Sequence, residues 1–281
     1  MATYFGGKNQ LYRQIINLIP RHTRFVEAFA GSAAVSRHLA RGAAEALVIE
    51  RDVEQVRWLK SQRELAGHRV VGGDAFQVLE ANARVWGPET VIFADPPYPI
   101  EDRRDARARY RCELDELAHE RLVRLLRASR ARVLVCGHPW GWYPTAFEDW
   151  KRHEFTVGLR NGCAGVECVW TNFDDPYPLH DYRFFGADKR TRQDLKRRIE
   201  RQVRMFGSMD RHHRAAIMRA LELEFPADAG AGTSGRRRDR AAADGARADV
   251  ADGRPAVRAR ARSAQKGYRN RVAQVPGTSA P

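Results

Sequence analysis

Between residues 25 and 173 the chain alternates between short apolar runs and segments whose apolar residues recur at helical spacing. The apolar runs predict seven strands, at 24–29, 46–50, 69–73, 90–94, 132–137, 154–159 and 167–173. The helical spacing predicts helices at 33–41, 53–65, 75–85 and 114–128. Strands that alternate with helices favour an α/β fold, here a doubly wound, mainly parallel seven-stranded sheet with helices on both faces.

The last two predicted strands are joined by a short stretch that contains the sequence NGCAG at 161–165. Asparagine and glycine so close together are typical of a tight turn rather than of a helical crossover. We therefore expect 154–159 and 167–173 to form an antiparallel hairpin at the end of the sheet.

Beyond Asp174 the pattern changes from strands to two basic helical segments. In the first segment, apolar residues recur at 195, 199, 203 and 206 while Arg and Lys crowd the other faces. The second helix is expected to follow Ser208 as its cap and to end near Phe225. These patterns predict a sheet domain at 1–177, a small basic helical appendage at 178–226 and a basic tail at 227–281.

The net charge is +14, and half of this excess lies in the tail, where 12 Lys or Arg stand against 5 Asp or Glu, a net of +7. The tail has almost no large apolar residues, so we expect it to be disordered. Two interpretations stay open for it, a solvated extension or a non-specific arm for nucleic acid. The charge of the whole chain favours a polyanionic partner.

Composition also narrows the compartment and the type of site. The 4 cysteines show no C-x-x-C spacing, which is typical of a reducing compartment and does not favour a metal centre. No apolar run reaches the length of a membrane span, and the start of the chain lacks a signal-peptide pattern. We expect a cytoplasmic protein without a metal or a membrane partner. A basic surface on one domain favours a monomer, with a weak dimer left open.

Ligands of open parallel sheets bind beyond the carboxyl ends of the strands, and there this chain places four acids, Glu27, Glu50, Asp74 and Asp95. The interval from Gly31 to Glu50 is close to that between a nucleotide-binding turn and the acid that holds ribose hydroxyls. Glu27 beside this turn would repel a pyrophosphate but suits a ligand that carries positive charge. S-adenosylmethionine fits, since it offers a ribose to Glu50, an adenine amino group to Asp74 and a sulfonium to the acidic pocket.

A set of short sequences extends this pattern over roughly residues 4–173. In order they are YFGGK (4–8), LIP (18–20), FVEAFAGSAAV (25–35), VIERD (48–52), GDAF (73–76), DPPY (95–98), ERLVRLLRASRARVLVCG (120–137) and ECVWTNF (167–173). The set resembles the DNA adenine-N6 methyltransferases of the Dam-like, D12 type, particularly the phage-type adenine methylases. The resemblance implies a Rossmann-like class I methyltransferase fold, S-adenosyl-L-methionine as the cofactor and the N6 amine of an adenine in DNA as the acceptor.

The DPPY sequence carries the expected chemistry. The exocyclic amine of adenine is a poor nucleophile because its lone pair is delocalised into the ring. Asp95 and the carbonyl of Pro96 can each accept one of its hydrogen bonds, and the stiffness of Pro96 and Pro97 holds both acceptors in place. Tyr98 offers a ring on which a base extracted from the duplex can stack.

The resemblance also implies a pocket for the cofactor or the base. Tyr4 and Lys8 are expected to line it. The other expected cofactor-binding residues are Glu27, Ala28, Phe29, Gly31, Glu50, Asp74 and Asp95.

The chain departs from this family at three places. Ala28 stands where proline is frequent, and Ala33 stands where a second glycine is common. Only 20 residues separate Asp74 from Asp95, an interval in which Dam-like enzymes often carry a target-recognition domain. We therefore expect sequence readout from the loop 99–115 and from the basic helices after residue 187. The candidate DNA-binding residues are Arg103, Arg104, Arg107, Arg109, Tyr110, Arg111, Arg197 and Arg198.

Three alternatives stay open: the same chemistry on RNA adenine, the same chemistry on the N4 amine of cytosine, and an inactive relative that only binds nucleic acid. The intact acids at the strand ends argue against the inactive relative. A cysteine-based cytosine methylase is not expected, because Asp95 occupies the strand end where such an enzyme places its thiol. The target sequence and the existence of a restriction partner stay open as well.

Overall fold

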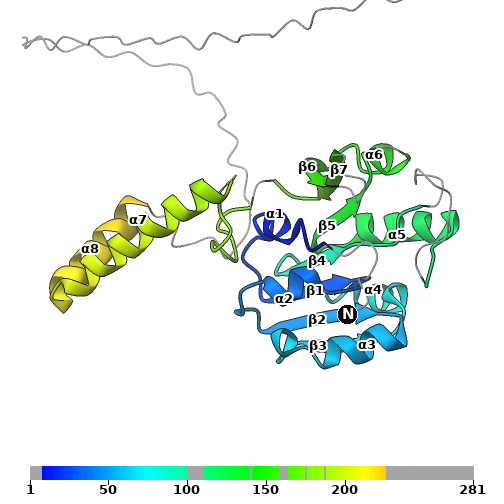
Figure 1. The fold of residues 1–281 in the computed structure, drawn as a ribbon, viewed down its shortest axis with the longest axis horizontal. Helices are drawn as coiled ribbons and strands as arrows, with labels where there is room; N and C mark the ends of the chain where they lie inside the picture. Colours follow the sequence, from blue (N-terminus) through cyan, green and yellow to red (C-terminus); the bar gives the residue numbers. More distant parts are fainter. Residues whose placement is uncertain are drawn as a thin grey trace, which may run out of the picture. The chain divides into compact units, whose positions relative to one another are not determined.

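The computed structural model describes residues 8–99, 111–139, 141–158, 164–174, 176–186 and 188–225. Its strands form one seven-stranded sheet (Figure 1). In spatial order the strands are β3 (Arg69–Gly72), β2 (Glu45–Glu50), β1 (Arg24–Ala28), β4 (Thr90–Ala94), β5 (Arg132–Gly137), β7 (Ala164–Thr171) and β6 (Lys151–Gly158). β1 to β5 are parallel, whereas β7 runs antiparallel to both β5 and β6.

This order confirms the doubly wound sheet and the C-terminal hairpin, and it is the order of the Rossmann-like class I methyltransferase fold. The strand order reverses at β1, which has β2 on one side and β4 on the other. The crossovers that leave β1 and β4 diverge, so the carboxyl ends of these two strands border a crevice. Residues that follow these two strands therefore lie at the usual place for a ligand in such a sheet.

Helices cover both faces of the sheet (Figure 1). Alternate residues of β1 show how the faces divide, because Phe25 packs with the α1 and α2 residues while Val26 packs with those of α4 and α5. A smaller cluster joins Val48 of β2 to the segment of α3 and η1. One face thus carries α1 (Tyr12–Ile16), α2 (Ala34–His38), α3 (Val53–Lys60) and η1 (Arg63–Leu65), and the other carries α4 (Ala75–Asn82), α5 (Glu116–Ala128) and α6 (Tyr143–Ala146).

Several predicted boundaries were wrong. The helix expected at 33–41 spans only five residues, because Ala33 adopts a left-handed φ of 47° and Leu39 is extended. The helix expected at 53–65 ends at Lys60 and is followed by the 3-10 turn of η1. Both hairpin strands begin three residues earlier than predicted, at Lys151 and Ala164. Charged residues at the start of β6 hid its period-two pattern, in which half-buried and exposed residues alternate.

Two further helices, α7 (Lys189–Ser208) and α8 (Arg211–Glu224), confirm the predicted basic helical segments. The expected cap was wrong, because Ser208 lies in the last turn of α7 and its hydroxyl donates to the carbonyl of Met205. Asp210 caps α8 instead, accepting hydrogen bonds from the backbone N–H groups of His212 and His213 at 2.9 and 3.0 Å. The predicted tail at 227–281 lies outside the described residues.

The segment that precedes α7 is bound to the sheet domain by backbone and side-chain hydrogen bonds. Leu179 forms an isolated antiparallel bridge with Pro20, and the side chain of Asp181 accepts a hydrogen bond from the N–H of Ala40 at 3.0 Å. In the described part of the chain, the helices are all too short or too polar to cross a lipid bilayer.

Candidate active site

The loop after β1 is held in an unusual backbone conformation. Phe29, Gly31 and Ala33 all have positive φ angles, of 56°, 51° and 47°. This conformation costs roughly 1 kcal/mol for a residue with a side chain and concentrates at functional sites. The N–H of Ala30 donates to the carbonyl of Ile49 at 2.9 Å, which holds the loop against the end of β2.

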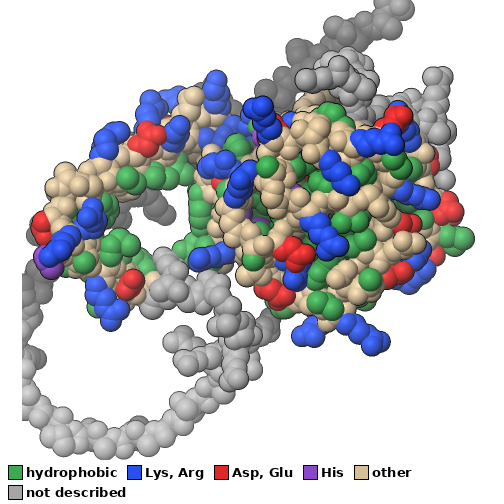
Figure 2. Space-filling view, turned by 90° about the horizontal axis from the view of Figure 1, so that it is seen from below, with side chains coloured by type: hydrophobic (Ala, Val, Ile, Leu, Met, Phe, Trp, Pro, Cys, Tyr) green, Lys and Arg blue, Asp and Glu red, His purple; other side chains and the backbone are tan. Residues whose placement is uncertain are grey.

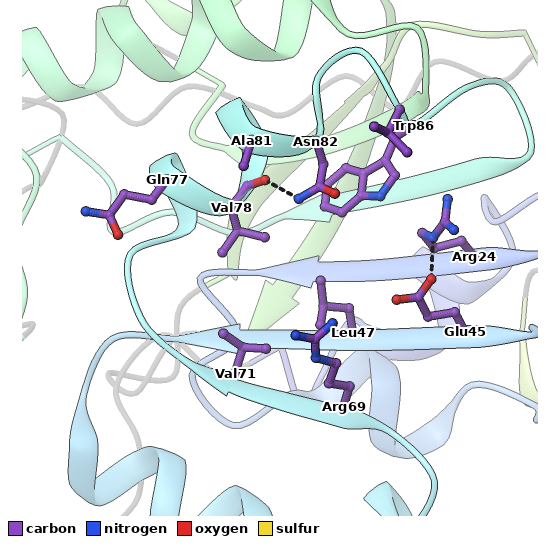
Figure 3. Close-up of a pocket in the computed structure, with 11 residues that line it drawn as sticks. Arg24, Glu45, Leu47, Arg69, Val71, Gln77, Val78, Ala81, Asn82 and Trp86 are labelled. Atoms are coloured by element: carbon purple, nitrogen blue, oxygen red, sulfur yellow. Dashed lines mark hydrogen bonds and ion pairs between the residues drawn. The ribbon is translucent and has the colours of Figure 1, made fainter.

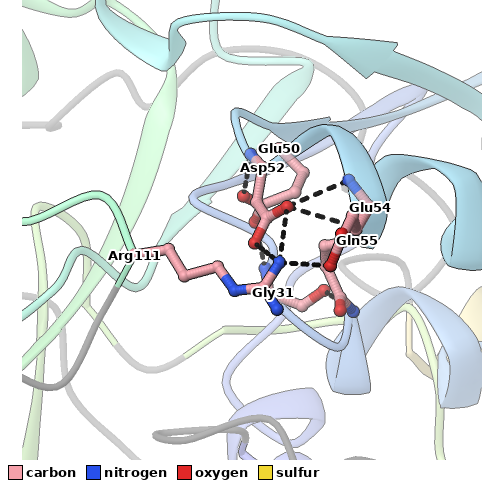
Figure 4. Close-up of polar contacts among 6 residues, drawn as sticks. All are labelled: Gly31, Glu50, Asp52, Glu54, Gln55 and Arg111. Carbon is pink, nitrogen blue, oxygen red and sulfur yellow. Dashed lines mark hydrogen bonds and ion pairs between the residues drawn. The ribbon is translucent and has the colours of Figure 1, made fainter.

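Glu50, the last residue of β2, holds this loop through hydrogen bonds to its backbone. One carboxylate oxygen accepts from the N–H of Gly31 at 2.7 Å and the other from the N–H of Asp52 at 2.8 Å (Figure 4). Gln55 closes the loop, since its amide donates to the carbonyl of Gly31 at 2.7 Å. A carboxylate oxygen can accept two hydrogen bonds, so each oxygen of Glu50 keeps capacity for a hydroxyl.

Asp74 lies at the next strand end, where it caps α4 by accepting from the N–H of Phe76 at 2.9 Å. The rings of Phe29 and Phe76 meet edge to face, with their centroids 5.7 Å apart. Two aromatic rings and a carboxylate beside Glu50 and Gly31 form a surface suited to a nucleoside.

A buried polar cluster lies at the end of β4. The ammonium of Lys8 contacts Asp95 Oδ1 at 2.6 Å, Glu167 Oε1 at 2.9 Å and the Tyr98 hydroxyl at 2.9 Å. The hydroxyl of Tyr98 donates to Glu167 Oε1 in turn. The side chains of Lys8, Asp95 and Glu167 are only 5%, 17% and 16% exposed. Three segments that are far apart in the sequence therefore meet in one ion-pair network.

Burial and the neighbouring charges set the pKa values in this cluster. Burial raises the pKa of Asp95 to about 6, and the Glu167 carboxylate adds to the rise while Lys8 opposes it. Burial alone would lower the pKa of Lys8, but Asp95 and Glu167 outweigh it and hold that pKa well above its usual value. Burial likewise opposes ionisation of Glu167, yet Lys8 and the Tyr98 hydroxyl lower its pKa. Glu167 is thus the firmly ionised carboxylate, and Asp95 titrates near neutral pH.

Glu27 lies near Asp95, but its carboxylate binds backbone N–H groups. Its carboxylate accepts from the N–H groups of Ser36 and Val35 at 2.6 and 3.4 Å, at the start of α2. Burial raises its pKa to about 7, despite these hydrogen bonds. A direct contact between Glu27 and a positively charged ligand stays a prediction.

The structure brings most of the predicted site residues to one edge. Lys8 and Tyr98 contact the Asp95 cluster, and Pro96 and Pro97 follow Asp95 directly. The N–H of Asp95 also donates to the carbonyl of Ala28 at 3.3 Å, next to the Phe29–Gly31 loop. The predicted residues that lie outside the described part of the chain are Tyr4, Arg103, Arg104, Arg107, Arg109 and Tyr110.

The remaining predicted DNA-binding residues lie on the surface. Arg111 pairs with Asp52 and Glu54, at 3.2 and 2.5 Å (Figure 4). Arg197 and Arg198 are exposed on α7, where Arg197 pairs with Asp194.

Glu167 was missed by the sequence reasoning. Its signal is a single carboxylate inside the apolar strand AGVECVWT. The sequence does not show where this carboxylate lies, because that depends on the antiparallel register of β7 against β5, which pairs Cys168 with Gly137. This register places Glu167 just beyond the carboxyl end of β5.

A separate cleft of about 400 Å³ lies on the face of α4 (Figure 3). Arg24 and Glu45, the first residues of β1 and β2, line it and pair at 2.6 Å. These residues place one end of the cleft at the amino ends of the strands, and Asp95 does not line it. Among the described residues, no group of three or more His, Cys, Asp and Glu side chains could hold a metal ion.

A family model described as Conserved hypothetical protein 95 matches residues 8–136, less than half of the chain. It is not a model of the D12 adenine methylases, so that resemblance stays a prediction. No curated protein matches the chain.

Solved structures share parts of the fold with this chain at low similarity. The Escherichia coli protein yhhF, provisionally described as a methyltransferase, is 23% identical, with 60% of this chain and 84% of that chain covered and a TM-score of 0.38. A hypothetical protein of Thermus thermophilus is 22% identical over 61% and 89% of the two chains, with a TM-score of 0.42. A SAM-dependent methyltransferase of Agrobacterium tumefaciens is 12% identical over 58% and 59%, with a TM-score of 0.38. These values are too low to transfer an activity or a substrate to this chain.

Proposed function

We propose that this chain is an S-adenosylmethionine-dependent methyltransferase that acts on the N6 amine of an adenine in DNA. The observation that carries the proposal is the position of Asp95. It follows the central strand β4 at the switch point of the sheet, is fixed by Lys8, and leads into Pro96, Pro97 and Tyr98. A hydrogen-bond acceptor held on stiff backbone next to the Phe29–Gly31 loop suits methyl transfer to an exocyclic amine.

The residues of the loop after β1 fit the proposed cofactor. Ser32 Oγ is buried, and no described residue forms a hydrogen bond with it. Glu50 keeps acceptor capacity for ribose hydroxyls, and Asp74 lies beside the Phe29 and Phe76 rings, where an adenine amino group would be recognised. When bound, S-adenosylmethionine supplies a methyl group activated by its sulfonium.

Asp95 would direct the amine and receive its proton. Its Oδ1 is held by Lys8, and its Oδ2 makes no hydrogen bond or ion pair with the described residues, so Oδ2 is the acceptor offered to an N–H of the amine. In the transfer, the amine nitrogen forms a bond to the methyl carbon while the carbon–sulfur bond breaks. The methylated nitrogen then loses one proton. A carboxylate whose pKa is about 6 is suited to accept that proton and pass it to water.

The adenine must leave the duplex to reach Asp95. Pro96 offers a second acceptor through its carbonyl, and Tyr98 is the expected stacking partner. The ring of Tyr98 is buried here and meets His138 edge to face, with the centroids 4.4 Å apart. Stacking of the target base on Tyr98 stays a prediction.

Contact with the DNA backbone would come from the basic face of α7. This helix carries 8 Lys or Arg against 2 Asp or Glu between residues 189 and 208, a net of +6. Figure 2 shows Lys and Arg side chains gathered along α7 and α8, with hydrophobic side chains on another side of these two helices. A concentrated row of exposed cations is typical of phosphate contact.

The test is nucleoside mass spectrometry on DNA and RNA from a methylase-deficient host that expresses the protein. N6-methyladenine in DNA is expected with the wild type and not with Asp95→Ala. Asp149→Ala, which removes an exposed carboxylate that pairs with Arg127 at the end of α5, is the matched control and should leave the product unchanged. Methylcytosine, or methyladenine confined to RNA, would overturn the acceptor but keep the methyl transfer. Unmodified DNA and RNA would overturn the enzyme itself.

A further inference from the structure

Glu167 reaches the candidate active site only because β7 runs against its neighbour. In the parallel part of the sheet, each strand brings its last residue to the carboxyl edge. β7 is antiparallel to β5 and pairs Cys168 with Gly137, the last residue of β5. Glu167, in the first half of β7, therefore lies at the same edge as Asp95.

The contacts of Glu167 are with the two side chains that surround Asp95. Its Oε1 accepts hydrogen bonds from both the Lys8 ammonium and the Tyr98 hydroxyl. Lys8 in turn contacts Asp95 Oδ1. Glu167 thus ties the N-terminal segment and the residues after β4 to the outer hairpin, without itself contacting Asp95 through a hydrogen bond.

We propose that Glu167 is a positioning residue of the methyl-transfer centre, which holds the Lys8 ammonium and the Tyr98 ring so that Asp95 Oδ2 faces the acceptor amine. This inference rests on the function proposed above. Glu167 compensates the charge of Lys8, so that the ammonium serves to orient Asp95 and the network as a whole is left with one net negative charge. A net negative site favours the positive charge that develops on the methylated nitrogen.

Several groups face Asp95 and contribute to its ionisation. Lys8 stabilises the carboxylate, whereas the Glu167 carboxylate destabilises it. The buried Glu27, Cys136 and Tyr98 side chains also interact electrostatically with Asp95. Removing the charge of Glu167 should therefore lower the pKa of Asp95, and removing the charge of Lys8 should raise it. General loosening of the site would instead expose Asp95 and lower its pKa in both variants.

The first measurement is steady-state methylation by Glu167→Gln over a range of pH. The kcat value should fall by about 10- to 100-fold, as expected when a reacting group is held less well, and the acidic limb of the pH profile should move to lower pH. The KM for S-adenosylmethionine should change by less than about threefold, because Glu167 does not contact the Gly31–Glu50 loop. Glu154→Gln is the matched control, since Glu154 lies on the same hairpin with a side chain 56% exposed, and it should behave as the wild type.

A second variant separates the reach of Glu167 from its charge. Glu167→Asp keeps the carboxylate but shortens the side chain by one methylene. It should lower kcat as well, while the acidic limb stays close to that of the wild type. This variant also serves if Glu167→Gln does not fold.

A third measurement does not depend on activity. Carbon-13 NMR of the Asp95 carboxyl carbon reports the pKa of Asp95 directly. Its resonance is assigned because it is missing from the spectrum of Asp95→Asn. The pKa should fall in Glu167→Gln and rise in Lys8→Met. If the wild type methylates nothing, the proposed function fails, and this titration still decides whether Glu167 acts on Asp95. The inference is overturned by an unchanged kcat in Glu167→Gln, by an Asp95 pKa that does not move, or by a loss of cofactor affinity as large as the loss of kcat.

Discussion

Two clusters near the carboxyl edge of the sheet contain the same charges, one cation between two carboxylates. Lys8 lies between Asp95 and Glu167, and Arg111 lies between Asp52 and Glu54. Both clusters join segments that are far apart in the sequence. They differ in burial, because the Lys8 side chain is 5% exposed and the Arg111 side chain 68%.

This difference decides what each cation does. An exposed ion pair is screened by water and salt and gives up side-chain entropy, so it contributes little to stability. A buried cation cannot be removed without leaving buried carboxylates uncompensated, which is costly. The buried cluster therefore controls ionisation and geometry, and the exposed one mainly ties a loop end to the start of α3. Four predictions test this contrast, beginning with the largest effect.

Lys8→Met should be the most damaging single change. At pH 8 it leaves Asp95 and Glu167 ionised and buried, so the free energy of unfolding should fall by about 3 kcal/mol. Lys8 itself stays charged from pH 5 to 8 because its pKa is raised, so any pH dependence of the loss comes from the carboxylates. Without Lys8 both carboxyl pKa values rise, and protonation toward pH 5 should recover part of the loss. Urea unfolding at the two pH values measures this.

Lys60→Met is the matched control, because Lys60 is exposed on α3. It should leave the free energy of unfolding nearly unchanged at both pH values. An equal loss in the two variants, or a Lys8→Met loss that does not depend on pH, would show that the buried network is not what stabilises this edge.

Glu27→Gln tests a buried carboxyl that forms no ion pair with a Lys, Arg or His in the described part of the chain. The pKa of Glu27 is raised from 4.5 to about 7, so the native state binds the proton more tightly than the unfolded state. The wild type therefore loses stability as pH rises from about 5 to 8. Glutamine removes this titration, so the stability of the variant relative to the wild type should rise by about 2 kcal/mol over that interval. A difference that stays constant with pH would refute the assignment.

The two clusters also show what the sequence could reveal. Asp95, Glu50 and Asp74 each follow an apolar run, so a local pattern placed them at one edge of a parallel sheet, and the structure agrees. The partnership of Lys8 with Glu167 depends on the register of an antiparallel strand and on the path of the N-terminal segment, which no local pattern encodes. For the same reason the Lys8 pKa could not be predicted from the sequence.

The end of one helix also could not be predicted from a local pattern. Asp210 and Ser208 are both good capping residues, and the sequence alone favoured the earlier one. The structure selects Asp210 because its extended backbone lets the carboxylate reach two N–H groups, whereas Ser208 is still helical. Local competition between two plausible caps is settled by backbone conformation rather than by residue type.

Exposed cations that add little to stability should still contribute to the binding of a polyanion such as DNA. The double variant Arg197→Ser, Arg198→Ser should weaken DNA binding by about 5- to 10-fold at moderate salt, because each phosphate contact adds to the salt-dependent part of the affinity. The slope of log affinity against log salt should become shallower by about two. Fluorescence anisotropy with duplex DNA at several salt concentrations measures both quantities.

The control for this double variant is Arg121→Ser, which removes an exposed cation that pairs with Glu80 on the sheet domain. It should leave the salt slope within error of the wild type. If the α7 variant and the control have the same slope, α7 does not contact phosphate, and the proposed docking of DNA on this helix fails.

The smallest effect is expected for Arg111→Ala. Arg111 contacts as many carboxylates as Lys8 does, but the consequences of its removal are smaller. Water can solvate the exposed Glu54 carboxylate, and Asp52 keeps its hydrogen bonds from the N–H groups of Glu54 and Gln55. The melting temperature should not change measurably at either low or high salt. A loss comparable with that of Lys8→Met would mean that the number of ion pairs, rather than their burial, determines stability at this edge. Differential scanning calorimetry on the two variants side by side decides between these explanations, because each variant removes one positive charge and the two cations differ strongly in exposure.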